Sequence, residues 1–427
     1  MRSDRYRKKN NKKRSKLKIA LIVLLIAAIL AGGIYAGVRI AAEKMLNDNL
    51  NRKELEKKDL SIVDVDGYVN ILLLGTDART MDKAALESSN SDCIIIVSIN
   101  TKTNDVNLIS IYRDTYLPVS PTGYGKINSA LSLGGPEATI RSLNETMDLN
   151  ISNYVLFNWK MVADLVDEVG GIDVDLRESE RVALNKYRRQ TAKVIGAPAP
   201  PSIEAPGPQI LNGVQAVTYG RIRKGVGDDF KRTDRMRYVI DRVLERAKKQ
   251  GPTKLLKMIE ICMENCETSL PNDDIIGLVQ RLPQYSIGGS TGYPYTLKDG
   301  MIRGGAYIVG TDLADDAERL HAELFGQTDY RASAKVLEIA QACWNFYNTG
   351  YTTGNYGTNY DGYNALHYPE EPEGEEAGSA AGSAAESGAA AGSTGSAASG
   401  STAGQTGETA AGSTTGQTGE TAAAPAA

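Results

Sequence analysis

Between residues 67 and 347, short apolar runs typical of strands alternate with segments in which apolar residues recur at helical spacing. This order of elements predicts a layered α/β domain. Three short runs, 68–75, 92–99 and 106–111, are almost continuously apolar, as expected of strands buried on both faces of a sheet. A polar, turn-forming hexapeptide joins the second run to the third and predicts a hairpin. Apolar residues then recur at helical spacing over 136–147, 159–169, 212–219, 229–250, 253–266, 311–325 and 331–347.

The segments between and beyond these elements differ in amino-acid composition. A strand is predicted at 172–176, a polar and then Pro-rich surface excursion at 177–208, and loops with strands at 271–309. Before the domain, the charged stretch 39–66 has a helical pattern and predicts an extracytoplasmic stalk. After it, the pattern predicts a Tyr/Gly-rich linker at 348–376 and a low-complexity, disordered tail at 377–427.

Residues 19–38 form the longest apolar segment and carry no charge. A helix of this length is about 30 Å long, enough to cross the hydrocarbon layer of a membrane. Residues 1–18 contain ten Lys or Arg and one acid, which predicts a cytoplasmic basic segment and a domain outside the membrane. A cleaved signal peptide would have a shorter apolar core, so we interpret 19–38 as a single-pass signal anchor.

Composition excludes several classes of function. The net charge is −4, but the charges are unevenly distributed along the chain: the N-terminal segment is basic, and no Lys or Arg follows Lys335. The basic residues lie directly beside the apolar span, so membrane topology explains them without nucleic-acid binding. Two histidines argue against a His-rich metal site or a histidine relay. Four cysteines without a C-x-x-C pair argue against zinc ribbons, iron–sulfur clusters and a disulfide scaffold.

Acids and arginines gather where the predicted strands begin or end. Asp77 and Arg79 follow the first strand, Asp92 opens the second, and Arg113 follows the third. Ligands of open α/β sheets collect at strand ends, so these residues point to one site.

Arginines further along the chain indicate the chemistry of this site. Arg221 and Arg223 are two residues apart, so on an extended segment both point the same way. Paired guanidiniums bind phosphate or pyrophosphate in fork geometry, and two carboxylates such as Asp77 and Asp92 suit Mg²⁺. Acids and arginines without histidine favour phosphoryl chemistry on an anionic substrate.

Seven segments in order resemble the LytR-CpsA-Psr family over residues 69–250. They are NILLLGTDAR (70–79), SDCIIIVSI (91–99), LISIYRDTYLPV (108–119), KINSALSLGGP (126–136), VDEVGGIDVDL (166–176), LNGVQAVTYGRIR (211–223) and GDDFKRTDRMR (227–237). The resemblance implies an α/β/α sandwich with a mixed central sheet and an apolar groove for a lipid. It also implies an enzyme of a Gram-positive-type cell envelope, which transfers a phosphoglycan (teichoic acid, capsule or a similar polymer) from a polyprenyl-pyrophosphate carrier to a peptidoglycan hydroxyl.

The resemblance also assigns roles by position. Asp77 and Asp92 would hold Mg²⁺, or Mn²⁺ in its place, on the pyrophosphate, and together with Arg113 they are the predicted catalytic residues. The predicted pyrophosphate ligands are Arg79, Arg113, Arg221 and Arg223, with Asn128, Arg232 and Arg235 bordering the site.

The chain departs from the family pattern at three positions. Asn90 replaces an arginine, Tyr112 replaces a proline, and Met236 replaces a glutamine. The loss of a cation at Asn90 gives weight to a non-catalytic regulator or scaffold of the cell envelope. A second alternative is a pyrophosphatase that cleaves the same donor with water. The acid and arginine pattern favours the transferase.

Overall fold

A mixed seven-stranded sheet forms the centre of the computed structural model, which describes residues 39–47, 50–82, 85–86, 89–121, 123–222 and 229–350. The strands lie in the order β1 (Asn51–Arg52), β10 (Cys266–Thr268), β7 (Asn153–Asn158), β2 (Tyr68–Thr76), β3 (Ser91–Asn100), β4 (Asp105–Ile111) and β11 (Ser286–Tyr293). β2 pairs parallel with β7 and antiparallel with β3, and β3 pairs antiparallel with β4. The predicted hairpin is therefore confirmed.

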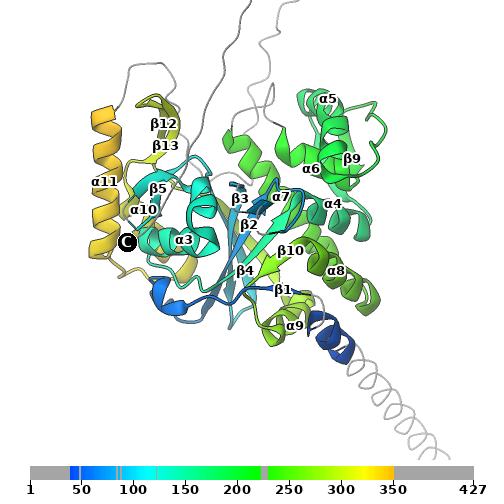
Figure 1. Cartoon of the computed structure of the whole chain (residues 1–427), viewed down its shortest axis with the longest axis horizontal. Helices are drawn as coiled ribbons and strands as arrows, with labels where there is room; N and C mark the ends of the chain where they lie inside the picture. Colours follow the sequence, from blue (N-terminus) through cyan, green and yellow to red (C-terminus); the bar gives the residue numbers. More distant parts are fainter. Residues whose placement is uncertain are drawn as a thin grey trace, which may run out of the picture. The chain divides into compact units, whose positions relative to one another are not determined.

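Helices cover both faces of this sheet (Figure 1). One face carries α4 (Trp159–Glu168), α6 (Gly213–Arg221), α7 (Asp229–Ala247), α8 (Pro252–Asn265) and α9 (Asn272–Arg281), with α5 (Glu178–Ile195) packed on α6. The other face carries α3 (Ala130–Met147), α10 (Leu313–Phe325) and α11 (Ala334–Gly350). The expected α/β/α arrangement around a mixed sheet is thus confirmed for the described residues.

Short elements complete the domain. Three two-stranded sheets pair β5 (Tyr116–Ser120) with β6 (Gly123–Lys126), β8 (Ile172–Leu176) with β9 (Gly207–Leu211), and β12 (Leu297–Ile302) with β13 (Gly305–Gly310). In the part of the chain that the structure describes, turns of 3₁₀-helix lie at Lys57–Asp59, Ile127–Ser129 and Leu282–Gln284.

Strand β3 shows why its sequence is apolar at nearly every position. Cys93 and Ile95 face the core on the α7 side, whereas Ile94 and Ile96 face the core on the α3 side. Successive side chains of a strand point to opposite faces, so burial on both faces requires a continuous apolar run.

Three sequence predictions differ from the structure. Among the described residues of 39–66, α-helix covers 39–47 and a 3₁₀ turn covers Lys57–Asp59, and Leu60 and Val65 are buried against the body of the domain. The excursion at 177–208 contains the 18-residue helix α5, whose Ala183, Leu184 and Ile195 are buried. The segment 271–309 contains the helix α9 in addition to strands.

Two predictions fall outside the described residues. The span at 19–38 and the tail at 377–427 are not among them, nor is the linker beyond residue 350, although its first three residues end α11. Within the described part of the chain, no helix has the length and apolarity that a membrane crossing needs.

Candidate functional site

The predicted carboxylates lie at one edge of the central sheet. β2 ends at Thr76, and Thr76 pairs with Ser91, the first residue of β3. Asp77 directly follows β2 and Asp92 is the second residue of β3, so both acids lie at the same edge of the sheet. The side chain of Asp92 is 24% exposed, whereas Asp77 and Arg79 are exposed on the segment that follows β2. Both acids therefore lie at one edge of the sheet, with Asp92 half-buried and Asp77 exposed.

Arg113 ties Asp92 into a row of alternating charges. Its Nη1 donates to Oδ1 of Asp92 at 2.6 Å, and its Nε lies 3.3 Å from Oδ2 of Asp114. Lys126 Nζ lies 2.9 Å from the other oxygen of Asp114. Because charge-assisted hydrogen bonds are short and directional, this row fixes the guanidinium of Arg113 at the strand edge.

The backbone around Arg113 is fixed as well. The amide of Asn128 donates to the Arg113 carbonyl oxygen at 3.1 Å, and the hydroxyl of Ser91 donates to the Asn128 carbonyl oxygen at 3.4 Å. Asn128 lies buried in the 3₁₀ turn that precedes α3. The predicted border residue Asn128 therefore connects the end of β4 with the start of β3.

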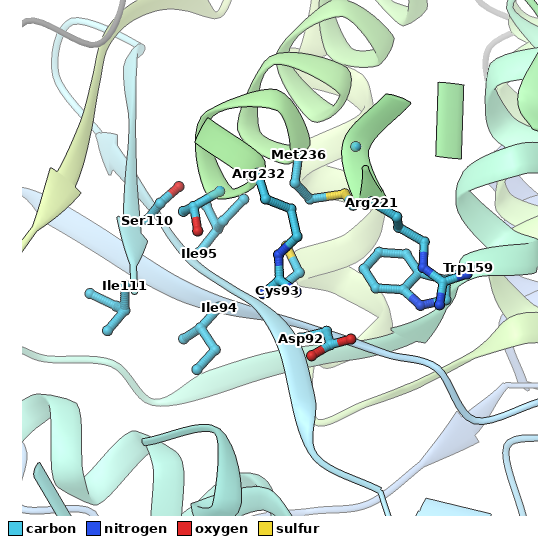
Figure 2. Close-up of a pocket in the computed structure, with 12 residues that line it drawn as sticks. Asp92, Cys93, Ile94, Ile95, Ser110, Ile111, Trp159, Arg221, Arg232 and Met236 are labelled. Carbon is cyan, nitrogen blue, oxygen red and sulfur yellow. The ribbon is translucent and has the colours of Figure 1, made fainter. Parts of the chain in front are cut away.

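A cavity of about 120 Å³ opens beside Asp92, between the sheet edge and helices α6 and α7 (Figure 2). Arg221 and Arg232 line it from these helices, and Figure 2 shows both side chains reaching down toward the strand that carries Asp92. The guanidinium carbon of Arg221 lies 5.6 Å from the centroid of the Trp159 ring, a cation–π contact. Guanidiniums at a concave, partly buried place attract a phosphorylated ligand.

Local sequence explains where Arg221 lies. The side chain of Asn212 accepts from the Gln215 amide and caps the start of α6. A Cβ at Gly213 would overlap the Ala163 carbonyl oxygen, so glycine allows α6 to approach α4 closely. Arg221 is the last residue of α6 and is therefore helical, whereas the extended backbone that the sequence predicts begins one residue later. Arg223, the other half of the predicted pair, lies outside the described residues.

Arg235 differs from its predicted place. It is 2% exposed, its Nε donates to Glu180 Oε1 at 3.0 Å, and its Nη1 donates to the Ile222 carbonyl oxygen. It is not among the residues that line the cavity. The physical reason is its partner on α5: the buried carboxylate of Glu180 holds Arg235 between α5 and α7, away from the sheet edge.

A second, larger cavity of about 350 Å³ follows on the same face of the sheet. Cys93 and Ile95 of β3 line the charged cavity, and Val97 and Ile99 of the same strand line the larger one. Helices α7, α8 and α9 contribute side chains that are almost all apolar. The sequence shows part of this wall in the helical spacing of Ile240, Val243, Leu244 and Ala247, but it does not show that the wall leaves a space.

The donor set suits a magnesium ion at the sheet edge. Mg²⁺ usually keeps several waters and takes one or two carboxylates together with phosphate oxygens. Asp77 and Asp92 can supply the two carboxylates from one edge of the sheet. Within the described residues, no group of three or more His, Cys, Asp or Glu side chains forms a complete protein-only metal site. Asp77 and Asp92 therefore fit an ion that two carboxylates and a phosphate group hold together.

A sequence profile of the LytR_cpsA_psr family matches residues 34–315. The chain belongs to the LytR-CpsA-Psr family. The resemblance seen in the sequence motifs is therefore confirmed.

Relatives of known name are similar over the same region. The polyisoprenyl-teichoic acid–peptidoglycan teichoic acid transferase TagU of Bacillus licheniformis is 30% identical over 240 residues, which are 55% of this chain and 71% of that protein. Biofilm regulatory protein A of Streptococcus mutans is 29% identical over 269 residues, which are 60% of this chain and 63% of that protein. The solved structure of protein gbs0355 from Streptococcus agalactiae has a TM-score of 0.52 at 22% identity, covers 75% of this chain and 100% of its own, and shows the same fold.

The three departures from the LytR-CpsA-Psr pattern are accommodated by packing. Asn90 accepts a hydrogen bond from Ser132 of α3 at 3.0 Å. Tyr112 is buried and packs edge-to-face on Phe230 of α7, with ring centroids 4.8 Å apart. Met236 lines the charged cavity and packs against Gly220 of α6. The sequence singled out these positions only as departures, whereas the structure places Met236 in the candidate site itself.

Proposed function

We propose that this protein transfers a phosphoglycan from a polyprenyl-pyrophosphate carrier to a hydroxyl of peptidoglycan. The observation that carries the proposal is the succession of two cavities along one face of β3, a charged one at the strand edge and an apolar one behind it. An amphiphile with an anionic head and a long hydrocarbon tail matches this succession. The names of the TagU relatives support the same class of reaction.

In this proposal the apolar cavity holds the polyprenyl tail. Burial of each methylene group away from water contributes about 0.8 kcal/mol, so a tail of several isoprene units is held in the apolar cavity rather than exposed to water. Val97 and Ile99 form the floor of the cavity, and the helices α7 to α9 form its roof. The pyrophosphate then lies at Cys93 and Ile95, within reach of Arg221 and Arg232.

The reaction replaces the phosphoanhydride bond of the donor with a phosphodiester bond to the acceptor. The acceptor oxygen attacks the glycan-side phosphorus and forms a new P–O bond. The bond between that phosphorus and the bridging oxygen breaks, and polyprenyl phosphate leaves with the electron pair. Arg221 and Arg232 stabilise the charge that develops on the leaving phosphate, because preorganised cations act most strongly where charge appears in the transition state.

The carboxylates of the sheet edge complete the proposal. Asp77 and Asp92 would hold Mg²⁺, which neutralises phosphate charge when it is bound. Both Asp92 and Asp114 pair with Arg113, but Asp114 also pairs with Lys126 and does not line the cavity, whereas Asp92 lines it. We therefore assign the proton of the attacking hydroxyl to a carboxylate oxygen of Asp92. The span at 19–38 would anchor the enzyme with this site outside the cytoplasmic membrane.

The test uses the full chain in detergent with a polyprenyl-pyrophosphoryl oligosaccharide, peptidoglycan oligomers and Mg²⁺. We expect Arg113→Ala and Asp92→Ala to lose transfer at least a hundredfold, because each removes one partner of the pair at the strand edge. Arg331→Ala is the matched control, since Arg331 is 72% exposed and pairs only loosely with Glu318.

Three outcomes would change the proposal. Near-normal transfer by either site variant, at a melting temperature equal to that of the wild type, would refute the site. Cleavage of the donor without an adduct on peptidoglycan would favour the pyrophosphatase. An intact donor that still binds would favour a non-catalytic envelope protein.

A further inference from the structure

The helix over residues 39–47 packs against the domain beside the apolar cavity. Its Ala42 and Leu46 are buried and form one apolar cluster with Ile259 and Met263 of α8. The members of each pair are four residues apart, so they share one face of their helix, and the two helices meet along an apolar seam. Figure 1 shows the 39–47 helix in dark blue beside α9. This helix therefore belongs to the body of the domain, unlike the separate stalk that the sequence predicts.

Polar contacts join the same helix to the start of α9. Arg39 Nη2 lies 3.5 Å from Asp273 Oδ1, and the side-chain amide of Asn272 donates to Oδ1 of Asn47. Exposed ion pairs add little stability, so the apolar seam provides most of the binding between the 39–47 helix and the domain.

Two residues of the N-terminal segment line the apolar cavity itself. Leu46 and Leu50 contribute to the wall that Leu278 and Val279 of α9 continue. Leu50 packs both on the main core of this face and on the seam with α8. The part of the chain that enters the domain therefore forms one side of the proposed lipid site.

The 39–47 helix also sets the distance between this cavity and the predicted span. Arg39 directly follows the span at 19–38, and Leu46 lies seven residues further along the helix. At about 1.5 Å per residue, Leu46 is at most about 11 Å beyond Arg39. The head-group layer on each side of the hydrocarbon is about 5–8 Å thick. In a chain anchored by this span, the cavity wall therefore begins next to the membrane surface.

We propose that the apolar cavity takes its lipid tail directly from the bilayer, along the wall that the 39–47 helix and α9 form. The bilayer is the partner of this face because residues 1–38, which include the predicted span, join the described chain at Arg39. Ile40 is 65% exposed on this helix, and an apolar side chain at this depth suits the boundary between head groups and acyl chains.

This route explains how a long tail reaches the cavity. A tail that passes from hydrocarbon to an apolar protein wall does not expose its methylene groups to water on the way. The polyprenyl phosphate that remains after transfer returns to the bilayer by the same route. The inference rests on the proposed function for the lipid and for the anchor, but uptake of the lipid can be measured without turnover.

The first test separates uptake of the lipid from affinity for it. A helical spacer of about 20 residues, of the Glu-Ala-Ala-Ala-Lys type, inserted between Val38 and Arg39 would hold the domain about 30 Å further from the bilayer. The full chain is reconstituted in phospholipid vesicles, and a polyprenyl pyrophosphate with a photoreactive tail is added to them. We expect crosslinking to the domain, followed by mass spectrometry over time, to be at least tenfold slower in the spacer variant.

Two controls show that the spacer acts through distance alone. Affinity for the same lipid in detergent micelles should equal that of the wild type, because the insertion lies outside the described contacts of the domain. The same spacer inserted after Gly350, at the other end of the described chain, should leave the rate of uptake from vesicles unchanged.

The second test asks whether this face lies on the membrane. Asp274→Cys places a thiol at an exposed position in the first turn of α9, and Arg331→Cys places one between α10 and α11, which cover the other face of the sheet. Burial raises the pKa of all four native cysteine thiols, so a maleimide dye at neutral pH reacts first with the introduced one. We expect a lipid with a nitroxide head group to quench the dye on Asp274→Cys at least threefold more than the dye on Arg331→Cys. The spacer should abolish this difference.

Each result either supports or overturns the route. Uptake by the spacer variant at the wild-type rate would overturn it, as would equal quenching at the two labelled positions. A chain that does not float with vesicles would remove both the anchor and the route. If uptake depends on the spacer but no glycan is ever transferred, the proposed transferase fails and the route stands.

Discussion

Arg235 provides a test that separates a structural arginine from a catalytic one. Its guanidinium and the Glu180 carboxylate are 2% and 5% exposed, so Arg235→Met leaves a buried carboxylate without its cation. Breaking a buried pair in this way costs about 3–5 kcal/mol. Glu180 keeps a hydrogen bond from the Arg177 amide, which favours the lower end of that range. At about 2–4 °C per kcal/mol, we expect the melting temperature to fall by roughly 6–12 °C.

The matched variants are Arg232→Met and the pair Glu180→Met/Arg235→Met. Arg232 lies one helical turn before Arg235 but lines the charged cavity, so its loss should weaken binding of a polyprenyl pyrophosphate about tenfold or more. The double methionine variant removes both buried charges and should recover most of the lost stability.

Thermal unfolding followed by circular dichroism, and lipid binding below the transition, give the two readings. Wild-type stability in Arg235→Met would refute the structural role. Weaker lipid binding by folded Arg235→Met than by Arg232→Met would show that Arg235 belongs to the lipid-binding site.

Three further predictions concern the apolar cavity and a buried acid. Val97→Phe should fill part of the cavity and weaken binding of long-chain polyprenyl pyrophosphates more than that of a short-chain analogue, measured by calorimetry; equal losses would contradict the tail site. Burial raises the pKa of Asp316 from 3.8 to about 7, so the folded protein keeps a proton that the unfolded chain releases above about pH 4. The free energy of unfolding should therefore fall as pH rises from about 4 to 7, and the melting temperature of Asp316→Asn should not show this fall. A variant whose melting temperature falls with pH as steeply as that of the wild type would contradict the prediction. Burial also raises the pKa of the Cys262 thiol to about 12, so maleimide labelling at pH 8, followed by mass spectrometry, should be slow and slower still with lipid bound. Labelling at the rate of an exposed thiol would show that the cavity is open to water.

The sequence predicts the sheet and its reactive edge because both depend on local pattern. Continuous apolar runs identify strands buried on two faces, and residues next to their ends must share an edge once the strands pair. The amino-acid pattern alone therefore suffices to place Asp77, Asp92 and Arg113 at one edge of the sheet.

Long-range partners could not be predicted in the same way. Arg232 and Arg235 lie three residues apart on one helix, and only the position of Glu180, 55 residues before Arg235, decides that Arg235 turns away. Glu180 lies on α5, which the polar composition of its segment concealed, because only four apolar residues among its 18 are buried. Cavities are harder still, since a wall of apolar residues has the same pattern whether its centre is filled or empty.

The fate of the glycan-side phosphate tests the central claim most directly. The full chain would be incubated with a donor labelled at that phosphorus and with peptidoglycan, and the digested products separated by mass. We expect the label in a phosphodiester between the glycan and a peptidoglycan sugar, with unlabelled polyprenyl phosphate released in equal amount. Label recovered only as free glycan phosphate, or an intact donor, would contradict the transferase.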